Sequence, residues 1–218
     1  LYDQKRQSMS EETLETYVKN FLAASPDGDV TMLWQGGEPT LRGLPFFERL
    51  IELCEKYRRP AQVVHHAVQT NGTLITEQWA RFFKDNDVLV GISIDGPAPL
   101  HDAYRLNRGG HGTHSMVIRG WEQLRNAEVD TNILCTVHAA NEDHGLEVYR
   151  YFRDELGAQY MQFIPIVERV PREHLRQAEL GWRSGSSALL YRQDGDCVTS
   201  RSTTPSSYGR FLSDIFDE

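Results

Sequence analysis

Short apolar runs alternate along the chain with longer amphipathic stretches. Five runs begin near residues 30, 63, 88, 131 and 160 and have the length and composition of strands. Between them, apolar residues recur at three- and four-residue spacing, which predicts helices. The predicted strands are residues 30–34, 63–69, 88–94, 131–137 and 160–166, and the predicted helices are residues 12–24, 44–57, 77–86, 113–126, 141–156 and 205–217. Ser8 and Glu11 have the spacing of a capping box, which predicts the beginning of the first helix.

A helix separates each predicted strand from the next, so the crossovers are right-handed and the sheet is parallel. Residues 88–94 are apolar almost throughout, as expected of a strand buried on both faces. Such an α/β sheet forms either an open doubly wound fold or a (β/α) barrel. Because the chain opens on a helix, we expect a further strand upstream. Five strands and one upstream favour a partial (β/α)6 TIM-like barrel, truncated at both ends.

The end of the chain has a different pattern from the rest. Residues 171–207 contain Gly181, Gly185 and Gly195, several serines and threonines, and little periodicity. Segments of this kind are typical of long loops, which are often functional. We therefore expect residues 1–170 to form the barrel core, and residues 171–218 to form a long loop and a final helix leading toward a C-terminal domain that the sequence lacks.

Composition limits the classes of partner. The 218 residues carry a formal net charge of −8, which argues against nonspecific nucleic-acid binding. No apolar run is long enough to span a membrane, and the first residues do not resemble a signal peptide. The three cysteines are too few and too scattered for a disulfide framework, so we expect a reducing cytoplasm.

Candidate binding residues follow the predicted strands, where ligands bind in parallel α/β folds. Gly36 and Gly37 allow close approach of a backbone to a ligand, and Glu38 offers a carboxylate to an ammonium group. Arg105 could bind a ligand carboxylate in bidentate fashion, with two parallel hydrogen bonds. Gln35 and Ser93 could contact polar edges, and residues 163–166 form an apolar lip for an adenine ring. Together these residues predict a site for an amino acid joined to a nucleoside.

Each of these signals also has an ordinary structural interpretation. The paired glycines and the segment 71–72 could be simple turns, and the segment 95–97 could simply terminate a strand. Arg105 could be a solvated loop cation. The eight histidines lack the spacing of metal ligands, which weakens the alternative of a hydrolase barrel that uses histidines and carboxylates. Cys54 and Cys135 are expected in the core. We therefore predict no metal ligand and assign no catalytic residue.

Five motifs give the sequence a family resemblance. They are WQGGEPT at 34–40, QTNGTL at 69–74, VGISIDGP at 90–97, HDAYR at 101–105 and QFIPIVE at 162–168. In this order they resemble the radical S-adenosylmethionine (SAM) enzymes, and more narrowly the anaerobic sulfatase-maturating enzymes. The resemblance runs from about residue 9 to residue 218.

The resemblance implies a fold, a cofactor and a reaction. The fold is a partial (β/α)6 barrel, and the cofactors are SAM and a [4Fe–4S] cluster in the full-length protein. A 5′-deoxyadenosyl radical oxidises a Cys or Ser side chain of a sulfatase polypeptide to formylglycine. A reductant such as flavodoxin or ferredoxin supplies electrons. At the matching positions, Gly36, Gly37 and Glu38 would hold the methionyl amino group, Gln35, Ser93 and Arg105 would make polar contacts to SAM, and Ile166 would pack near its adenine.

The sequence departs from the family in its cysteines. The CxxxCxxC loop that binds the cluster is absent, as are a cysteine-rich C-terminal segment and the family's catalytic acidic residue. We therefore expect this chain alone to be inactive. Two other functions stay open: a radical SAM enzyme that matures another peptide, and a noncatalytic SAM-binding α/β fragment.

Overall fold

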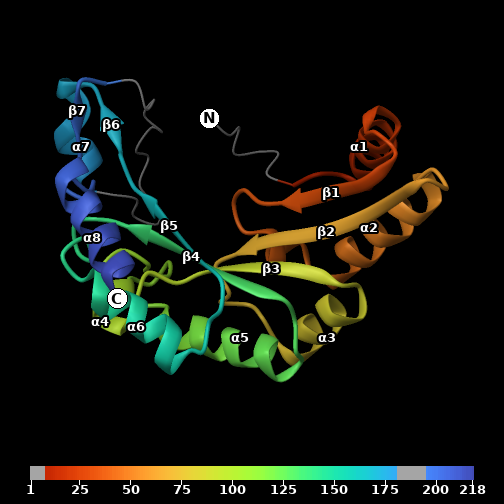
Figure 1. Ribbon diagram of the computed structural model, residues 1–218. Helices are drawn as coiled ribbons and strands as arrows, with labels where there is room; N and C mark the ends of the chain where they lie inside the picture. The colour runs from red at the N-terminus through yellow and green to blue at the C-terminus, as the bar shows by residue number, and fades with distance from the viewer. Residues whose placement is uncertain (1–7, 181–194) are drawn as a thin grey trace. The chain divides into compact units, whose positions relative to one another are not determined.

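The computed structural model describes residues 8–180 and 195–218 (Figure 1). The chain divides into two compact units. The first unit contains the residues up to Ile92 together with Ile118–Thr131, and the second unit contains Ser93–Val117 and Asn132–Glu218. The five main strands follow the chain in the order β1-β2-β3-β4-β5.

Helices and parallel strands alternate in the first unit. Its elements are α1 (Glu11–Ala24), β1 (Gly28–Trp34), the 3-10 turn η1 (Pro39–Arg42), α2 (Leu44–Tyr57), β2 (Gln62–Thr70), α3 (Glu77–Asp85), most of β3 (Val88–Ser93) and the later part of α5 (His114–Asn126). β1 pairs in parallel with β2, and β2 pairs in parallel with β3. In this register Trp34 lies opposite Val68 and Thr70 lies opposite Ile92, so the carboxyl ends of the three strands share one edge.

One face of these strands forms the core of the first unit. α1 packs beside α2, and the buried side of α2 reaches the sheet, where Cys54 Sγ lies 3.3 Å from Met32 Sδ. Residues alternate in burial along β1, as expected of a strand covered on one side. The prediction that the third strand is buried on both faces is wrong at Leu89, which is 46% exposed. The apolar run did not distinguish a strand covered on one side from one covered on both.

The second unit combines a parallel strand pair with a small antiparallel one. Its elements are α4 (Ala98–His101), the beginning of α5, most of β4 (Thr131–Val137), α6 (Gly145–Arg150) with its π-helical continuation η2 (Tyr151–Glu155), β5 (Met161–Pro165), β6 (Arg169–Val170), the 3-10 turn η3 (Arg172–His174), α7 (Leu175–Glu179), β7 (Cys197–Val198) and α8 (Pro205–Asp217). β4 and β5 are parallel. Phe163 on β5 packs between Phe152 and Phe211, with ring centroids 6.3 and 5.3 Å away, and so joins the strand to α8.

Most predicted elements are confirmed with boundaries that shift by no more than two residues. The predicted helix 141–156 corresponds to α6 and η2, but it begins only at Gly145, four residues later than predicted. Two details are corrected. Ser10 rather than Ser8 caps α1, because its Oγ accepts a hydrogen bond from Thr13 N at 3.2 Å. The long loop predicted for residues 171–207 contains η3, α7 and β7, while residues 181–194, with Gly181 and Gly185, lie outside the described residues. Within residues 8–180 and 195–218, no helix combines the length and apolarity needed to cross a membrane.

Gly120 on α5 is expected to tolerate no side chain. A Cβ at this position would lie 2.3 Å from the carbonyl oxygen of Gly72, in the loop that follows β2. Gly120→Ala should therefore lower the free energy of unfolding by about 1–3 kcal/mol, as overpacking does. Denaturant unfolding of the purified chain measures this change.

Gly209 on α8 provides the matched control. It is exposed, and no heavy atom lies within 4 Å of its added Cβ. Gly209→Ala should raise the free energy of unfolding by about 0.5–1 kcal/mol, because alanine favours a helix over glycine. Equal effects of the two substitutions would contradict the packing described here.

Candidate functional site

The loop after β1 presents backbone to solvent. Gly36 and Gly37 are exposed, and their φ angles of +100° and +57° lie in the left-handed region that favours glycine. No heavy atom lies within 4 Å of a Cβ built on either residue. The neighbouring Gln35 is also exposed. This loop therefore has open space in which a ligand can approach the main chain.

Glu38 is half-buried and fixes the loops that follow β1 and β2. Its Oε1 accepts hydrogen bonds from Thr40 N at 3.0 Å, Thr40 Oγ1 at 2.6 Å and Thr70 Oγ1 at 2.7 Å. Its Oε2 accepts one hydrogen bond, from Asn71 N at 2.7 Å. Because a carboxylate oxygen has two lone pairs, Oε2 keeps one acceptor position among the described residues. Glu38 is thus held rigidly and can still accept from an ammonium group.

The segment 70–72 has a role that sequence reasoning missed. Thr70 Oγ1 donates to Glu38 and accepts from Gly72 N at 3.1 Å, so one hydroxyl connects the carboxylate to the turn. Asn71 Oδ1 accepts from Thr73 N at 3.0 Å, which shapes the same turn. The interpretation of Asn71-Gly72 as an ordinary turn accounts for its backbone conformation, but not for the hydrogen bond that Asn71 N donates to Glu38. Hydrogen-bonding residues at two neighbouring strand ends were the signal available in the sequence.

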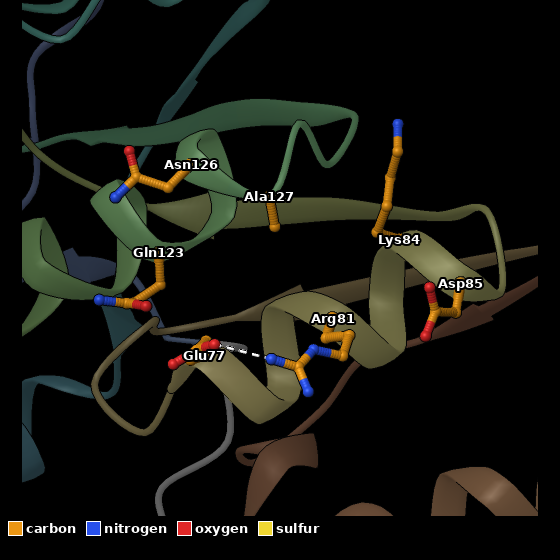
Figure 2. Close-up of a pocket in the computed structure, with 7 residues that line it drawn as sticks. All are labelled: Glu77, Arg81, Lys84, Asp85, Gln123, Asn126 and Ala127. Atoms are coloured by element: carbon orange, nitrogen blue, oxygen red, sulfur yellow. Dashed lines mark hydrogen bonds and ion pairs between the residues drawn. The ribbon is translucent and has the colours of Figure 1, made fainter.

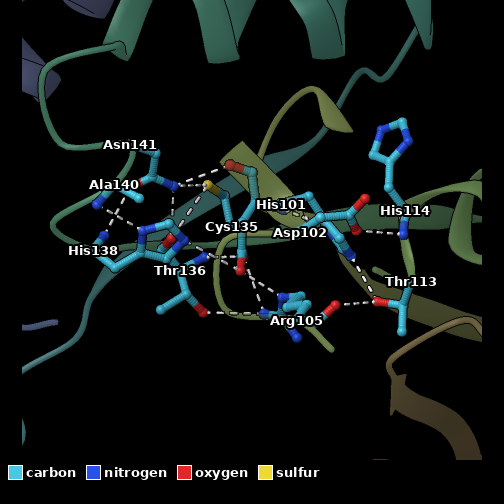
Figure 3. Close-up of polar contacts among 11 residues, drawn as sticks. His101, Asp102, Arg105, Thr113, His114, Cys135, Thr136, His138, Ala140 and Asn141 are labelled. Carbon is cyan, nitrogen blue, oxygen red and sulfur yellow. Dashed lines mark hydrogen bonds and ion pairs between the residues drawn. The ribbon is translucent and has the colours of Figure 1, made fainter. Parts of the chain in front are cut away.

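In the second unit, Arg105 is bound to Asp95. Arg105 Nε donates to Asp95 Oδ2, and Nη2 donates to Asp95 Oδ1 at 3.0 Å and to Thr136 Oγ1 at 3.2 Å. Figure 3 shows Arg105 and Thr136 within this polar network. The two-pronged interaction that the sequence suggested for a ligand carboxylate is made with Asp95. Arg105 is therefore a half-buried, positioned cation rather than a solvated loop residue.

The Asp95 carboxylate is ionised although it is almost fully buried. Burial alone raises the pKa of Asp95, but the nearby His138 imidazole, the charge and hydrogen bonds of Arg105 and the amide of Thr136 outweigh burial and lower it to about 2. His138 Nε2 lies 3.7 Å from Asp95 Oδ2, too far for a hydrogen bond, so we attribute its effect to electrostatics. The Asp95 carboxylate thus stays ionised beside Arg105 across the neutral pH range.

His101 supports the same loop as a neutral side chain. Its Nδ1 accepts from Asp95 N at 3.2 Å, so Nε2 carries the proton and donates to Thr113 Oγ1 at 3.1 Å. The Thr113 hydroxyl in turn donates to the carbonyl oxygen of Arg105 at 2.9 Å (Figure 3). Burial lowers the pKa of His101 to about 4, in agreement with this tautomer. This relay fixes the backbone on both sides of the Asp95–Arg105 pair.

Ser93 is the last residue of β3, and Ile166 directly follows β5. Ile166 N donates to Val137 O at 2.9 Å, and Ile166 O accepts from Thr203 N at 3.2 Å, so its backbone is held on both sides. Val137 directly follows Thr136, which contacts Arg105. Ile166 and Arg105 are thus anchored to adjacent residues of β4. Ser93 is half-buried at the end of β3.

Cysteines do not gather in the part of the chain that the structure describes. Cys54 and Cys135 are buried, and burial raises the pKa of Cys54 to about 12 and that of Cys135 well above its usual value. Cys197 is partly exposed on β7. Among residues 8–180 and 195–218, no three His, Cys, Asp or Glu side chains come together as a metal site would require. The described residues therefore do not fit an iron–sulfur cluster.

A surface cavity of about 470 Å³ lies between α3 and the end of α5 in the first unit (Figure 2). It is lined by Glu77, Arg81, Lys84, Asp85, Gln123, Asn126 and Ala127. Arg81 is paired with Glu77 at 2.7 Å, and Lys84 Nζ donates to Glu128 O at 2.7 Å. The charges at this cavity are thus largely used within the protein, and none of the predicted site residues lines it.

One family model matches more than half of the chain. The model of the Radical SAM superfamily matches residues 2–152. The chain belongs to the Radical SAM superfamily.

Two relatives show which enzymes of this superfamily the chain is similar to. The chain is 36% identical over 210 residues to a serine-type anaerobic sulfatase-maturating enzyme of Bacteroides thetaiotaomicron, which covers 96% of this chain and 48% of the relative. It is 36% identical over 209 residues to a cysteine-type anaerobic sulfatase-maturating enzyme of Clostridium perfringens. This match covers 96% of this chain and 50% of that relative. The chain thus spans about half the length of these relatives.

A solved structure is similar along nearly the whole chain. The structure described as native anSMEcpe with bound AdoMet and Cp18Cys peptide has a TM-score of 0.78 and 35% identity over 96% of this chain and 52% of that chain. The predicted α/β fold of partial-barrel type is confirmed by this likeness and by the parallel strands described above.

The buried His101 should make stability depend on pH. The unfolded chain binds its proton near pH 6.5 and the folded chain only near pH 4, so the unfolded state binds more protons between these values. The stability that depends on a neutral His101 is therefore fully present above about pH 6.5 and is lost as the pH falls toward 4. Between pH 7 and pH 5, His101 should contribute a loss of about 2 kcal/mol, measurable by denaturant unfolding.

His101→Asn isolates this contribution, because an amide oxygen can replace Nδ1 as the acceptor for Asp95 N but does not titrate. Burial also lowers the pKa of His66 and His114, so a smaller loss should remain in the variant. The variant should be less stable than wild type at pH 7 and should lose less stability at pH 5. An equal loss in both proteins would rule out His101 as a source of the pH dependence.

Proposed function

We propose that this chain is the SAM-binding part of a radical enzyme of the sulfatase-maturating type. The proposed reaction is the oxidation of a Cys or Ser side chain of a sulfatase polypeptide to formylglycine. Membership in the superfamily, the names of the similar enzymes and a similar solved structure with bound AdoMet support this proposal. Because those enzymes are about twice as long, the activity, the substrate and an electron donor such as flavodoxin or ferredoxin are all part of the proposal.

The binding residues have chemistry that suits the methionyl end of SAM. Glu38 Oε2 would accept a hydrogen bond from the amino group, and the exposed backbone of Gly36 and Gly37 would approach the ligand closely. Arg105 would donate to the carboxylate, and Gln35 would contact a polar edge.

Ser93 and Ile166 complete the proposed set. The half-buried Ser93 would contact another polar edge of SAM, and the apolar side chain of Ile166 would pack against the adenine. The division into a barrel core at residues 1–170 and a C-terminal segment at 171–218 stays a prediction, as does a cytoplasmic location.

The observation that carries the proposal is an unused hydrogen-bonding position on each of two fixed charged groups. Glu38 keeps one acceptor position on Oε2, and Arg105 keeps the donors of Nη1, among the described residues. An amino acid presents the complementary pair, an ammonium and a carboxylate.

SAM, when bound and reduced, supplies the deoxyadenosyl radical, and the protein supplies binding and orientation. The superfamily's [4Fe–4S] cluster would accompany SAM, but its ligands are not among the described residues, so we assign no residue of this chain to it. The residues discussed here act by holding the two ends of the amino-acid group and by packing on the nucleoside.

The residue type of the substrate is left open, since the relatives include serine-type and cysteine-type enzymes. Incubating the longer enzyme of which this chain would be the SAM-binding part, reduced and loaded with its cluster, with Cys-x-Pro-x-Arg peptides and their Ser counterparts, followed by mass spectrometry, tests the substrate class. Formation of the aldehyde supports sulfatase maturation. Turnover of SAM with neither peptide changed would favour the alternative of a radical enzyme for another peptide.

Binding of SAM to this chain tests the site directly. Glu38→Gln and Arg105→Ala should each weaken SAM binding about tenfold or more, because each removes a charge-assisted hydrogen bond worth about 1.5–3 kcal/mol. Isothermal titration calorimetry measures both dissociation constants.

Two variants serve as controls. Glu48→Gln changes an exposed carboxylate on α2, and Arg108→Ala changes an exposed arginine three residues after Arg105. Both should leave the dissociation constant unchanged. If all four variants bind SAM alike, the proposed site is wrong, and wild-type chain that binds no SAM would overturn the proposal itself.

The same chain should not hold an iron–sulfur cluster. A cluster needs several converging thiolates, and the high pKa values of Cys54 and Cys135 keep both thiols protonated. After anaerobic reconstitution with iron and sulfide, iron quantification and the charge-transfer absorbance should reveal no stoichiometric cluster. One cluster per chain would contradict this expectation.

A further inference from the structure

Thr136 contacts the Arg105 guanidinium next to the ion pair that Arg105 forms with Asp95. It belongs to β4, where Cys135 and Val137 face the core and Thr136 faces the opposite side, half-buried. Its Oγ1 accepts a hydrogen bond from Arg105 Nη2 at 3.2 Å. Thr136 lies outside the five sequence motifs of the family resemblance.

The hydrogen bonds of Arg105 leave one end of its guanidinium available. Nε has a single N–H, which donates to Asp95, and the two N–H groups of Nη2 are used by Asp95 and Thr136. Among the described residues, Nη1 donates to no partner. The guanidinium is planar, so fixing Nε and Nη2 also fixes the direction of the two N–H groups on Nη1.

The partners of Arg105 are themselves held in place. Thr136 N donates to Asp95 Oδ1 at 2.8 Å, which couples the strand to the carboxylate. Asn141 Nδ2 donates to Asp95 O and to Thr136 O, both at 3.0 Å, and Asn141 is fully buried. Figure 3 shows Asn141 and Thr136 on the same side of this network. The hydroxyl of Thr136 therefore projects from a rigid support.

We propose that Thr136 is a positioning residue for SAM binding: with Asp95, it orients Arg105 so that Nη1 alone meets the methionyl carboxylate. The inference rests on the proposed function of Arg105, and it adds which neighbouring residues determine the orientation of the guanidinium. Asp95 supplies the charge that retains the guanidinium, and the Thr136 hydroxyl determines the rotation of its free end. The site would then bind the carboxylate end-on rather than through the two-pronged contact already used by Asp95.

The test compares Thr136→Val with Thr136→Ser by titrating SAM into the purified chain. Valine keeps the shape of threonine and the backbone N–H that donates to Asp95, but it removes the acceptor for Nη2. It should weaken SAM binding about three- to tenfold, the fold-change of one lost hydrogen bond. Serine restores the hydroxyl and should bind SAM within about twofold of wild type. The unfolding midpoints of both variants are measured alongside, so that a loss of folding is recognised.

A double-mutant cycle separates positioning from a general structural effect. In an Arg105→Ala background, Thr136→Val should cause no further weakening, because Thr136 acts through Arg105. Equal weakening in both backgrounds, or wild-type affinity in Thr136→Val, would overturn the inference. If Arg105→Ala weakens binding and Thr136→Val does not, only the positioning role fails. If neither Arg105→Ala nor Glu38→Gln weakens binding, the proposed function fails as well.

Discussion

The candidate site depends on charged groups that are immobilised from one side and left open on the other. A buried or half-buried charge is stable only when it is paired or hydrogen-bonded, and each bond also restricts its direction. In the first unit, Glu38 accepts four hydrogen bonds, from Thr40 in η1, from Thr70 at the end of β2 and from Asn71 directly after it. In the second unit, Asp95 and Thr136 hold Arg105. Each group is thus already oriented in the free protein, and a ligand that bound to it would immobilise no further side chain there.

Much of the fold could be predicted from the sequence because it depends on local periodicity. The strand at Thr131–Val137 and the helices at Leu44–Tyr57 and Pro205–Asp217 were predicted with the bounds that the structure has. Features that depend on distant contacts were not. The pairing of Arg169–Val170 with Cys197–Val198 joins two-residue strands, too short to give a pattern, and the exposure of Leu89 depends on what covers the sheet.

The sequence predicts the part of the candidate site that consists of residues directly at strand ends. Gly36, Gly37 and Glu38 form an open loop as expected, but the hydrogen bond from Thr70 that fixes Glu38 was not predicted. Asp95 was interpreted as the end of a strand, and it is also the partner that holds Arg105. These roles arise from contacts between residues 10 to 41 positions apart, which spacing within a single motif does not reveal.

A high-resolution structure of this chain with SAM bound tests the central claim most directly. The account predicts that the methionyl amino group contacts Glu38 Oε2, that the carboxylate contacts Arg105 Nη1 end-on, and that the Asp95 and Thr136 contacts of Arg105 persist. A bound SAM whose amino-acid group touches neither residue, or an Arg105 that leaves Asp95 to form a two-pronged pair with the ligand, would contradict it.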